Sequence, residues 1–452
     1  MNYLYCLAVF TTFYIFFTLK ILKNDILSPA FVSGISLWIA TICVIFNEKK
    51  WLVTFSQKTF LIVAIGLITM LIAEIVAIKL PKIRVYRSKS NDYLKGPKLK
   101  KTGIATGEKY SPIELGFEKT LLLVVLNTVL FLIFYRSVVG SFSLDLSNIF
   151  ASGGIWRKDD VGFDGVEMNP VVLQSFRYII ACTVVYGLIF LYNLIICKRK
   201  SRLELSVFIY FTIIEVIESL LSASRRSMLI VLCAYFFMAV FFWYIKNDWK
   251  IKIPFKILIN TMIIIIIFCV VARASHSLVK GRESNLQSIT DYITYYIGGS
   301  LQTLNLVLKK YPNLLSNQAF GQNTMGSILR PLHLMPSNAE PYTEMLYLGG
   351  NAEASSNTYT TFLLPIFDFG YVGGMIEIFI LYFLYSRFYH KHIKFQNINN
   401  RLLLKIAVYA FTFWGVVMAY YCYPAGYIIA PTGALSLVCF IILFYYVFKV
   451  KM

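Results

Sequence analysis

The sequence predicts an all-α, polytopic integral membrane protein with about eleven transmembrane helices and a large, partly helical loop. Of the 452 residues, 58% are hydrophobic and only 15% are charged, too few polar side chains to cover a soluble globule. The charged residues gather between apolar runs of about 18 residues or more, the length that crosses a bilayer. A backbone in hydrocarbon must satisfy its own hydrogen bonds, so these runs are expected to be helices.

The apolar runs define one transmembrane domain over residues 1–452. The expected spans cover residues 2–22, 27–46, 59–79, 118–139, 171–196, 204–222, 228–246, 256–273, 362–386, 402–422 and 427–448. The first run has neither a charged start nor a small-residue cleavage site, so we expect it to be a span and not a cleaved signal.

Positive charge gathers in alternate loops and predicts the orientation of the chain. The basic loop over 80–117, the cluster 198–202 and the segment 387–401 all belong to one set of loops. Loops rich in Lys and Arg stay in the cytoplasm, which places the N-terminus outside and the C-terminus inside. The net charge is +20, and the Lys and Arg residues that produce it gather next to apolar runs. This position favours contact with anionic membrane lipids and argues against nucleic acid as a partner.

The loop over 274–361 should face the periplasm or the cell exterior. Its run ITDYITYYIGGSLQTLNLVLKKY has apolar residues at helical spacing and is expected to form a helix near the membrane interface. The segment that follows contains Pro331, Pro336 and Pro341 and should be irregular, because proline interrupts helices.

Motifs for metals and nucleotides are missing from the sequence. The eight cysteines form no CxxC pair and the four histidines form no HExxH motif, so no metal site is expected. No Walker loop or dinucleotide motif occurs, which leaves ATP hydrolysis and redox chemistry without support. We therefore expect no cofactor.

Arginines at the predicted outer ends of the spans are the candidate substrate-binding residues. They are Arg225, Arg226, Arg273, Arg282 and Arg330, with Arg177 as a further member. The planar guanidinium group suits phosphate oxygens. Each arginine taken alone could instead reach toward the interface or pair with a glutamate. Cations are under-represented on the outer side, so the group as a whole indicates an anion such as a diphosphate.

A second candidate group lies in SSNTYTTFLLPIFDFGYVGG. Asn357, Tyr359 and Thr360 offer hydrogen bonds that would orient sugar hydroxyls. Asp368 falls about two turns inside the predicted span, where a lone carboxylate is costly. It either contacts a ligand or pairs with an arginine, and the sequence favours neither.

The candidates for a catalytic base are His276, Glu283 and Asp368. His276 is attractive because histidine titrates near neutral pH, although a lone histidine is more often structural.

The pattern resembles the Wzy family, the bacterial polymerases of O-antigen and capsular oligosaccharide repeat units. The resemblance rests on DILSPAFVSGISLW, SASRRSMLI, YITYYIGGSLQTLN and SSNTYTTFLLPIFDFGYVGG, in this order and around the large loop. It implies a GT-C-like glycosyltransferase in the bacterial cytoplasmic membrane, with its active site on the outer face and no metal requirement. Such an enzyme moves a glycan from one undecaprenyl diphosphate carrier to another lipid-linked repeat unit.

The resemblance also implies partners and roles. The partners are an undecaprenyl-diphosphate-linked oligosaccharide, membrane lipids, a chain-length regulator and a flippase. Arg225 or Arg226, Arg273 and Arg282 would contact the diphosphate, with His276 and Asp368 nearby. The chain departs from the pattern in its predicted external N-terminus, since many relatives have both termini in the cytoplasm. The first outer loop holds only Glu48 as an acid, so the acidic metal motif of other GT-C enzymes is not evident.

Two alternatives stay open. A lipid-linked oligosaccharide flippase or other transporter would also need many spans, but its charges should line a cavity at mid-membrane. An O-antigen ligase would use the same donor and a different acceptor, and a membrane acyltransferase is a more distant alternative.

Overall fold

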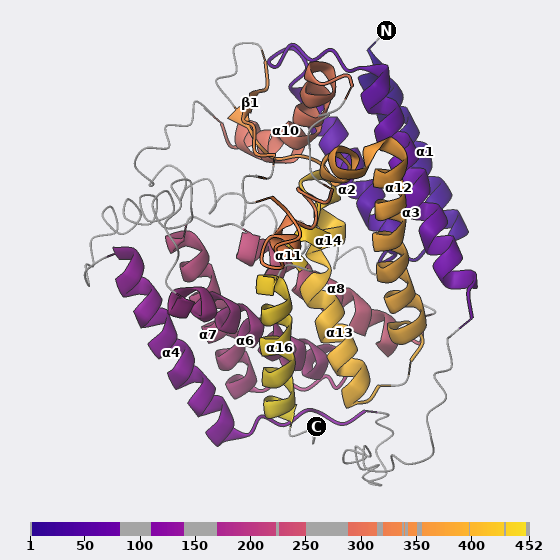
Figure 1. Ribbon diagram of the computed structural model, residues 1–452. Coiled ribbons are helices and arrows are strands. Elements are labelled where there is room, and N and C mark those ends of the chain that lie inside the picture. The colour runs from indigo at the N-terminus through magenta and orange to yellow at the C-terminus, as the bar shows by residue number, and fades with distance from the viewer. Residues whose placement is uncertain are drawn as a thin grey trace. The chain divides into compact units, whose positions relative to one another are not determined.

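The computed structural model describes residues 2–81, 110–139, 170–222, 226–249, 288–313, 320–336, 339, 342–349, 355–396, 398–428 and 431–448. The described residues are predominantly helical, which confirms the predicted all-α class (Figure 1). A two-stranded antiparallel sheet, β1 (Leu346–Tyr347) with β2 (Ser355–Ser356), pairs Leu346 with Ser356.

The helices follow the predicted spans closely. They are α1 (Tyr3–Ile21), α2 (Pro29–Phe46), α3 (Gln57–Lys79), α4 (Phe117–Val139), α6 (Pro170–Ile195), α7 (Arg202–Leu221), α8 (Arg226–Lys246), α10 (Ile289–Lys310), α11 (Gly326–Leu329), α12 (Leu363–Phe388), the π-helix η2 (Tyr389–Ile393), α13 (Asn400–Thr412), α14 (Trp414–Val417), the 3-10 helix η3 (Met418–Tyr420), α15 (Ala425–Ile428) and α16 (Pro431–Phe448). The predicted span 256–273 lies outside the described residues.

Within the described residues, eight helical segments are long and apolar enough to cross a membrane. This confirms a polytopic membrane protein, while the count of eleven spans stays a prediction. Helix α7 is of similar length but carries Glu204, Glu215 and Glu218, so its composition alone does not class it as a span.

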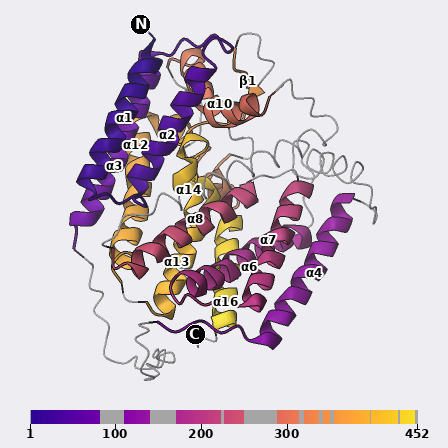
Figure 2. The same cartoon turned by 180° about the vertical axis from the view of Figure 1, so that it is seen from behind.

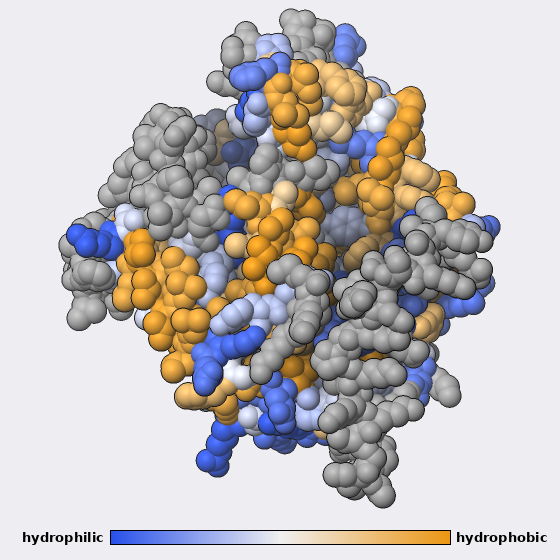
Figure 3. Space-filling view, turned by 60° about the horizontal axis from the view of Figure 1, so that its bottom comes forward, coloured by the Kyte–Doolittle hydropathy of each residue, from blue (hydrophilic) through white to orange (hydrophobic). Residues whose placement is uncertain are grey.

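Several helices present apolar side chains to their surroundings. Along α12, the side chains of Val372, Ile376, Ile380 and Leu384 are all exposed and recur every fourth residue, on one face of the helix. Helix α1 likewise exposes a set of phenylalanines. Figure 3 shows broad hydrophobic areas on the surface. Apolar surface of this extent is suited to lipid and not to water.

The chain divides into two compact units. Unit 1 comprises Met1–Lys82, Ser284–Lys394 and Trp414–Ala434, and unit 2 comprises Ile83–Glu283, Phe395–Phe413 and Leu435–Met452. Each unit is described by itself below, and the expectation of one transmembrane domain stays a prediction.

In unit 1, α12 packs mainly against α3, and α1 and α2 pack with each other and with α3. Both views show α3 beside α12 (Figures 1 and 2). Their core includes Leu37, Leu67, Phe362 and Ile366. The ring of Phe362 lies where a side chain at Gly66 would stand, since an added Cβ would be 2.2 Å from it. The glycine therefore allows α3 and the start of α12 to approach closely.

Helix α10 confirms the helix predicted in the large loop. It packs on α2, where a Cβ at Gly298 would lie 3.0 Å from the Cβ of Cys43. The N-terminus, α10 and β1 lie at the same end of unit 1 (Figures 1 and 2), which we call the α10 end. The opposite end holds the α1–α2 loop, Lys79 and Lys394, and we call it the basic end.

In unit 2, α6 packs against α4, α7 and α8, and α8 packs against α13. Stacked rings join α6 to α7, with Tyr186 4.6 Å from Phe211 and Phe190 4.5 Å from Phe208. The hydroxyl of Tyr235 in α8 donates to the carbonyl of Thr183 at 3.1 Å.

Helix α12 is interrupted at Gly370, which the sequence did not predict. Gly370 has φ +70° and ψ −177°, a region that only glycine adopts readily. The backbone of Pro365 and Ile366 then passes close to Gly374, where an added Cβ would be 2.8 Å from the Ile366 nitrogen. Gly374 therefore allows a close approach of backbone segments, while Gly370 breaks the helix.

Gly370→Ala is expected to lower the free energy of unfolding by about 1–3 kcal/mol, because alanine is strained at this backbone conformation. The space beside Gly370 is open, so the effect should come from the backbone and not from a clash. Unfolding in detergent micelles measures it. Gly116→Ala, at an open position outside the helices, is the control, and equal stability of the two variants would contradict an imposed break.

Candidate functional site

The carboxylate of Asp368, in α12, binds the segment of the large loop that contains Asn323 and Thr324. It accepts hydrogen bonds from the backbone N–H of Asn323 at 3.0 Å and from its side-chain amide at 2.7 Å. It also accepts from the backbone N–H and the hydroxyl of Thr324, both at 2.7 Å. Both carboxylate oxygens are therefore occupied by donors. Of the two interpretations left open by the sequence, pairing with an arginine is not the arrangement found among the described residues.

These contacts continue into a network of tyrosines around Glu344. The amide oxygen of Asn323 accepts from the Tyr342 N–H at 2.7 Å. The hydroxyls of Tyr342 and Tyr311 donate to the Glu344 carboxylate at 2.7 and 2.8 Å, and Lys310 forms an ion pair with it. We call the residues joined here the tyrosine network: Lys310, Tyr311, Asn323, Thr324, Tyr342, Glu344, Tyr359 and Asp368.

Charge in the tyrosine network is fixed by these donors. Partial burial alone would raise the pKa of Glu344, but hydrogen bonds from Lys310, Tyr342 and Tyr311 outweigh it and lower the pKa. Burial raises the pKa of Tyr342, and the neighbouring Glu344 raises it further. Burial also raises the pKa of Tyr359. At neutral pH the network thus holds an anionic Glu344 among neutral tyrosines.

Tyr359 and Thr360, predicted to bind a sugar, are buried, and Asn357 beside them is half-buried. The Tyr359 hydroxyl donates to the backbone carbonyl of Glu344 at 2.6 Å, so it supports the tyrosine network. The Thr360 hydroxyl has no hydrogen-bond partner. A role in substrate binding stays a prediction for all three.

Arg330 lies at the C-terminal end of α11, in the same segment as Asn323 and Thr324. Its side chain is half-buried, and its Nε is buried with no hydrogen-bond partner among the described residues. Among the described residues, no carboxylate forms an ion pair with it. A buried donor without an acceptor is uncommon and calls for an explanation. A bound anion would supply the acceptor.

The remaining predicted site residues belong to unit 2. Arg226 is exposed at the start of α8. Arg225, Arg273, His276, Arg282 and Glu283 lie outside the described residues. Arg330 and Asp368 are in unit 1. The convergence of the arginines on one diphosphate therefore stays a prediction.

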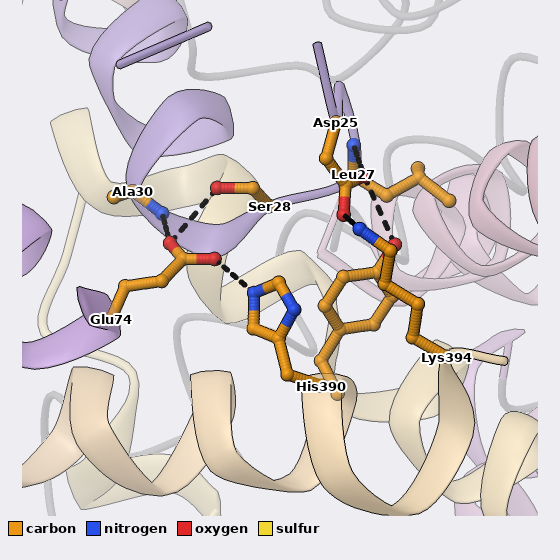
Figure 4. Close-up of polar contacts among 8 residues, drawn as sticks. Asp25, Leu27, Ser28, Ala30, Glu74, His390 and Lys394 are labelled. Carbon is orange, nitrogen blue, oxygen red and sulfur yellow. Dashed lines mark hydrogen bonds and ion pairs between the residues drawn. The ribbon is translucent and has the colours of Figure 1, made fainter. Parts of the chain in front are cut away.

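A polar cluster at the basic end was not predicted (Figure 4). The carboxylate of Glu74, fully buried in α3, accepts from the Ser28 hydroxyl at 2.9 Å and the Ala30 N–H at 2.8 Å. It also lies 2.6 Å from Nε2 of His390. Glu74 thus caps the N-terminus of α2 and binds η2, where the positive end of a helix favours an anion.

Asp25 makes the second contact of this cluster, also with the segment over residues 389–394. It pairs with Lys394 at 2.5 Å and accepts from the Tyr389 hydroxyl at 3.1 Å. It also accepts from the Leu27 N–H at 3.1 Å. Figure 4 shows both acids facing the turn that carries His390 and Lys394. The one sequence signal was an acid inside an apolar run, at Glu74.

Glu377, in the second part of α12, was also missed. One carboxylate oxygen accepts from the Tyr423 hydroxyl at 2.6 Å, and the other is buried with no contact of full hydrogen-bond geometry among the described residues. The sequence placed it in a predicted span without a partner, which is a signal for function or pairing.

Within the described part of the chain, no three His, Cys, Asp or Glu side chains are arranged to hold a metal ion. Comparison with family models, with curated proteins and with solved structures gave no match.

Proposed function

We propose that this protein is a membrane glycosyltransferase that polymerises undecaprenyl-diphosphate-linked oligosaccharide repeat units. The product would be an O-antigen or capsular polysaccharide, made on the outer face of the bacterial cytoplasmic membrane. The observation that carries the proposal is Arg330, a half-buried arginine whose Nε has no acceptor in the described part of the protein. It lies in a segment that Asp368 ties to a membrane helix. A lipid diphosphate reaches such a site from the bilayer and supplies the acceptor oxygens.

The charge pattern supports an outward-facing α10 end. The basic end of unit 1 carries Lys20, Lys79 and Lys391, and loops of this kind stay in the cytoplasm. The tyrosine network would then face the compartment in which repeat units are joined. Tyrosine rings offer sugars both an apolar face and a hydroxyl.

The chemistry assigns Arg330 to the leaving group. A hydroxyl of the acceptor sugar attacks the anomeric carbon of the donor glycan, and the bond from that carbon to the diphosphate oxygen breaks. Arg330 binds the departing diphosphate and stabilises its growing negative charge. The hydroxyl proton passes to a base, for which His276 and Glu283 stay the candidates. Asp368 suits positioning better, because its oxygens already accept from Asn323 and Thr324.

The experiment uses purified protein in liposomes with a defined undecaprenyl-diphosphate-linked repeat unit. The natural protein should produce a ladder of glycans. Arg330→Gln should slow its formation about 100-fold or more, the usual cost of removing a group that stabilises transition-state charge. Arg330→Lys should keep part of the rate, since lysine keeps the positive charge but lacks the planar set of donors of the guanidinium group.

Arg202→Gln is the matched control, because Arg202 is an exposed arginine at the start of α7 on the predicted cytoplasmic side. A normal ladder from Arg330→Gln would remove this arginine from the mechanism. No ladder, with the lipid-linked substrate crossing the membrane, would favour the second candidate, a flippase. That candidate draws support from the break of α12 at Gly370 beside Asp368, since transporters bind substrates at broken helices.

A further inference from the structure

Two buried glutamates of α7 have no ion-pair partner within the part of the chain that the structure describes. Glu215 is 1% exposed and Glu218 is fully buried, and residues three apart lie on one face of a helix. Among the described residues, no contact of their four carboxylate oxygens meets full hydrogen-bond geometry. No described Lys, Arg or His forms an ion pair with either. Glu204 of the same helix differs, because it pairs with Arg199 at 3.4 Å.

Two carboxylates cannot both stay charged in this position without a cation. Burial removes the water that stabilises each charge, and the two groups also repel each other. Natural chains keep buried acids only with a partner or with a function. The pair therefore needs a positive charge that the described side chains do not supply.

Ser227 of α8 completes an all-oxygen set of ligands. Its side chain is 7% exposed and its hydroxyl lies next to the Glu215 carboxylate. Among the described residues, no contact of this hydroxyl meets full hydrogen-bond geometry. Carboxylate and hydroxyl oxygens are the ligands of small hard cations.

Among the described ion pairs, none joins Glu215 or Glu218 to a cation on the helices packed against α7. On α8, Tyr235 interacts with Glu215, but its hydroxyl donates to Thr183. On α6, the hydroxyls of Tyr178 and Tyr186 bond to α4. The remaining charged or titratable groups on these three helices are Arg177, Cys182 and Tyr192 on α6, Glu118, Lys119, Tyr135 and Arg136 on α4, and Arg226, Cys233, Tyr244 and Lys246 on α8.

We propose that Glu215, Glu218 and Ser227 form a binding site for one small hard cation, either a proton or Na⁺, within unit 2. The site is independent of the proposed glycosyl transfer, and it would make the stability of the protein depend on that cation. A ligand that binds the folded chain and not the unfolded one raises the melting temperature in proportion to the logarithm of its concentration.

The experiment measures the melting temperature, Tm, of the full chain in detergent under two titrations. In the first, NaCl replaces N-methylglucamine chloride at constant ionic strength and pH 8. In the second, the pH falls from 8.5 to 5.5 without Na⁺. A sodium site predicts a Tm that rises with Na⁺ by about 2 °C or more. A proton site predicts no response to Na⁺ and a Tm that falls as the pH rises, because loss of the bound proton leaves buried negative charge without a cation.

The variants decide whether the pair carries the response. Glu215→Gln with Glu218→Gln should abolish it, and Ser227→Ala, a milder change, should weaken the response to Na⁺. Glu204→Gln, on the same helix, should retain it. The proposal is overturned if the natural protein responds to neither titration, or if its response persists unchanged in the double variant. Should the double variant not fold, Glu215→Gln and Glu218→Gln singly serve the same comparison.

Discussion

Lys394→Met is expected to lower the free energy of unfolding by about 3–5 kcal/mol, the usual cost of breaking a buried ion pair by removing one partner. Asp25 is almost fully buried and lies 2.5 Å from the Lys394 ammonium. Without that cation its charge keeps only the Tyr389 hydroxyl and the Leu27 N–H. Unfolding titrations in mixed micelles measure the loss.

The double variant Asp25→Asn with Lys394→Met is the control for this pair. It removes both charges, so most of the lost stability should return, because a buried pair replaced as a whole costs little. A Lys394→Met protein as stable as the natural one would show that Asp25 is neutral or solvated. That result would show that the Asp25–Lys394 ion pair does not stabilise the basic end.

Asp368→Ala is expected to release the segment around Asn323 and Thr324 from α12. Each buried donor left without an acceptor costs about 1–3 kcal/mol, and four donors point at this carboxylate. The loss of stability should therefore reach about 3 kcal/mol or more. Limited proteolysis between residues 320 and 349 should become faster, and glycan formation should fall with it.

Asp291→Ala provides the comparison, because Asp291 forms a partly exposed ion pair with Lys50 at 2.9 Å. Pairs of that kind contribute about 1 kcal/mol or less. If Asp368→Ala loses no more stability than Asp291→Ala, the hydrogen bonds of Asp368 do not hold the loop segment to α12. Thr324→Val separates the roles of Asp368: it should also impair glycan formation if the carboxylate positions the loop, and leave the rate intact if Asp368 is only a base.

Apolar runs predicted the helices well because span length and hydropathy are local properties. The run over 27–46 became α2, and the amphipathic pattern from Ile289 became α10. The break at Gly370 was missed because glycine is common in membrane helices, and its sequence does not reveal which dihedral angles the packing imposes.

Site residues were harder to predict, because their partners are distant in sequence. Asp368 was singled out as a costly charge, but its donors Asn323 and Thr324 lie 45 and 44 residues away. Asp25 and Lys394 are 369 residues apart. Pairing of an arginine with a glutamate was the alternative interpretation of the predicted site, and no described arginine pairs with Glu215 or Glu218.

By itself the sequence determined that this chain is a membrane protein, because mean hydropathy, the spacing of charged residues and the length of the apolar runs follow directly from residue types. Only the tertiary structure decided which buried charges are satisfied. A carboxylate in an apolar helix is costly wherever it occurs, but whether it meets a lysine, a backbone N–H or a bound cation depends on which helices fold against it.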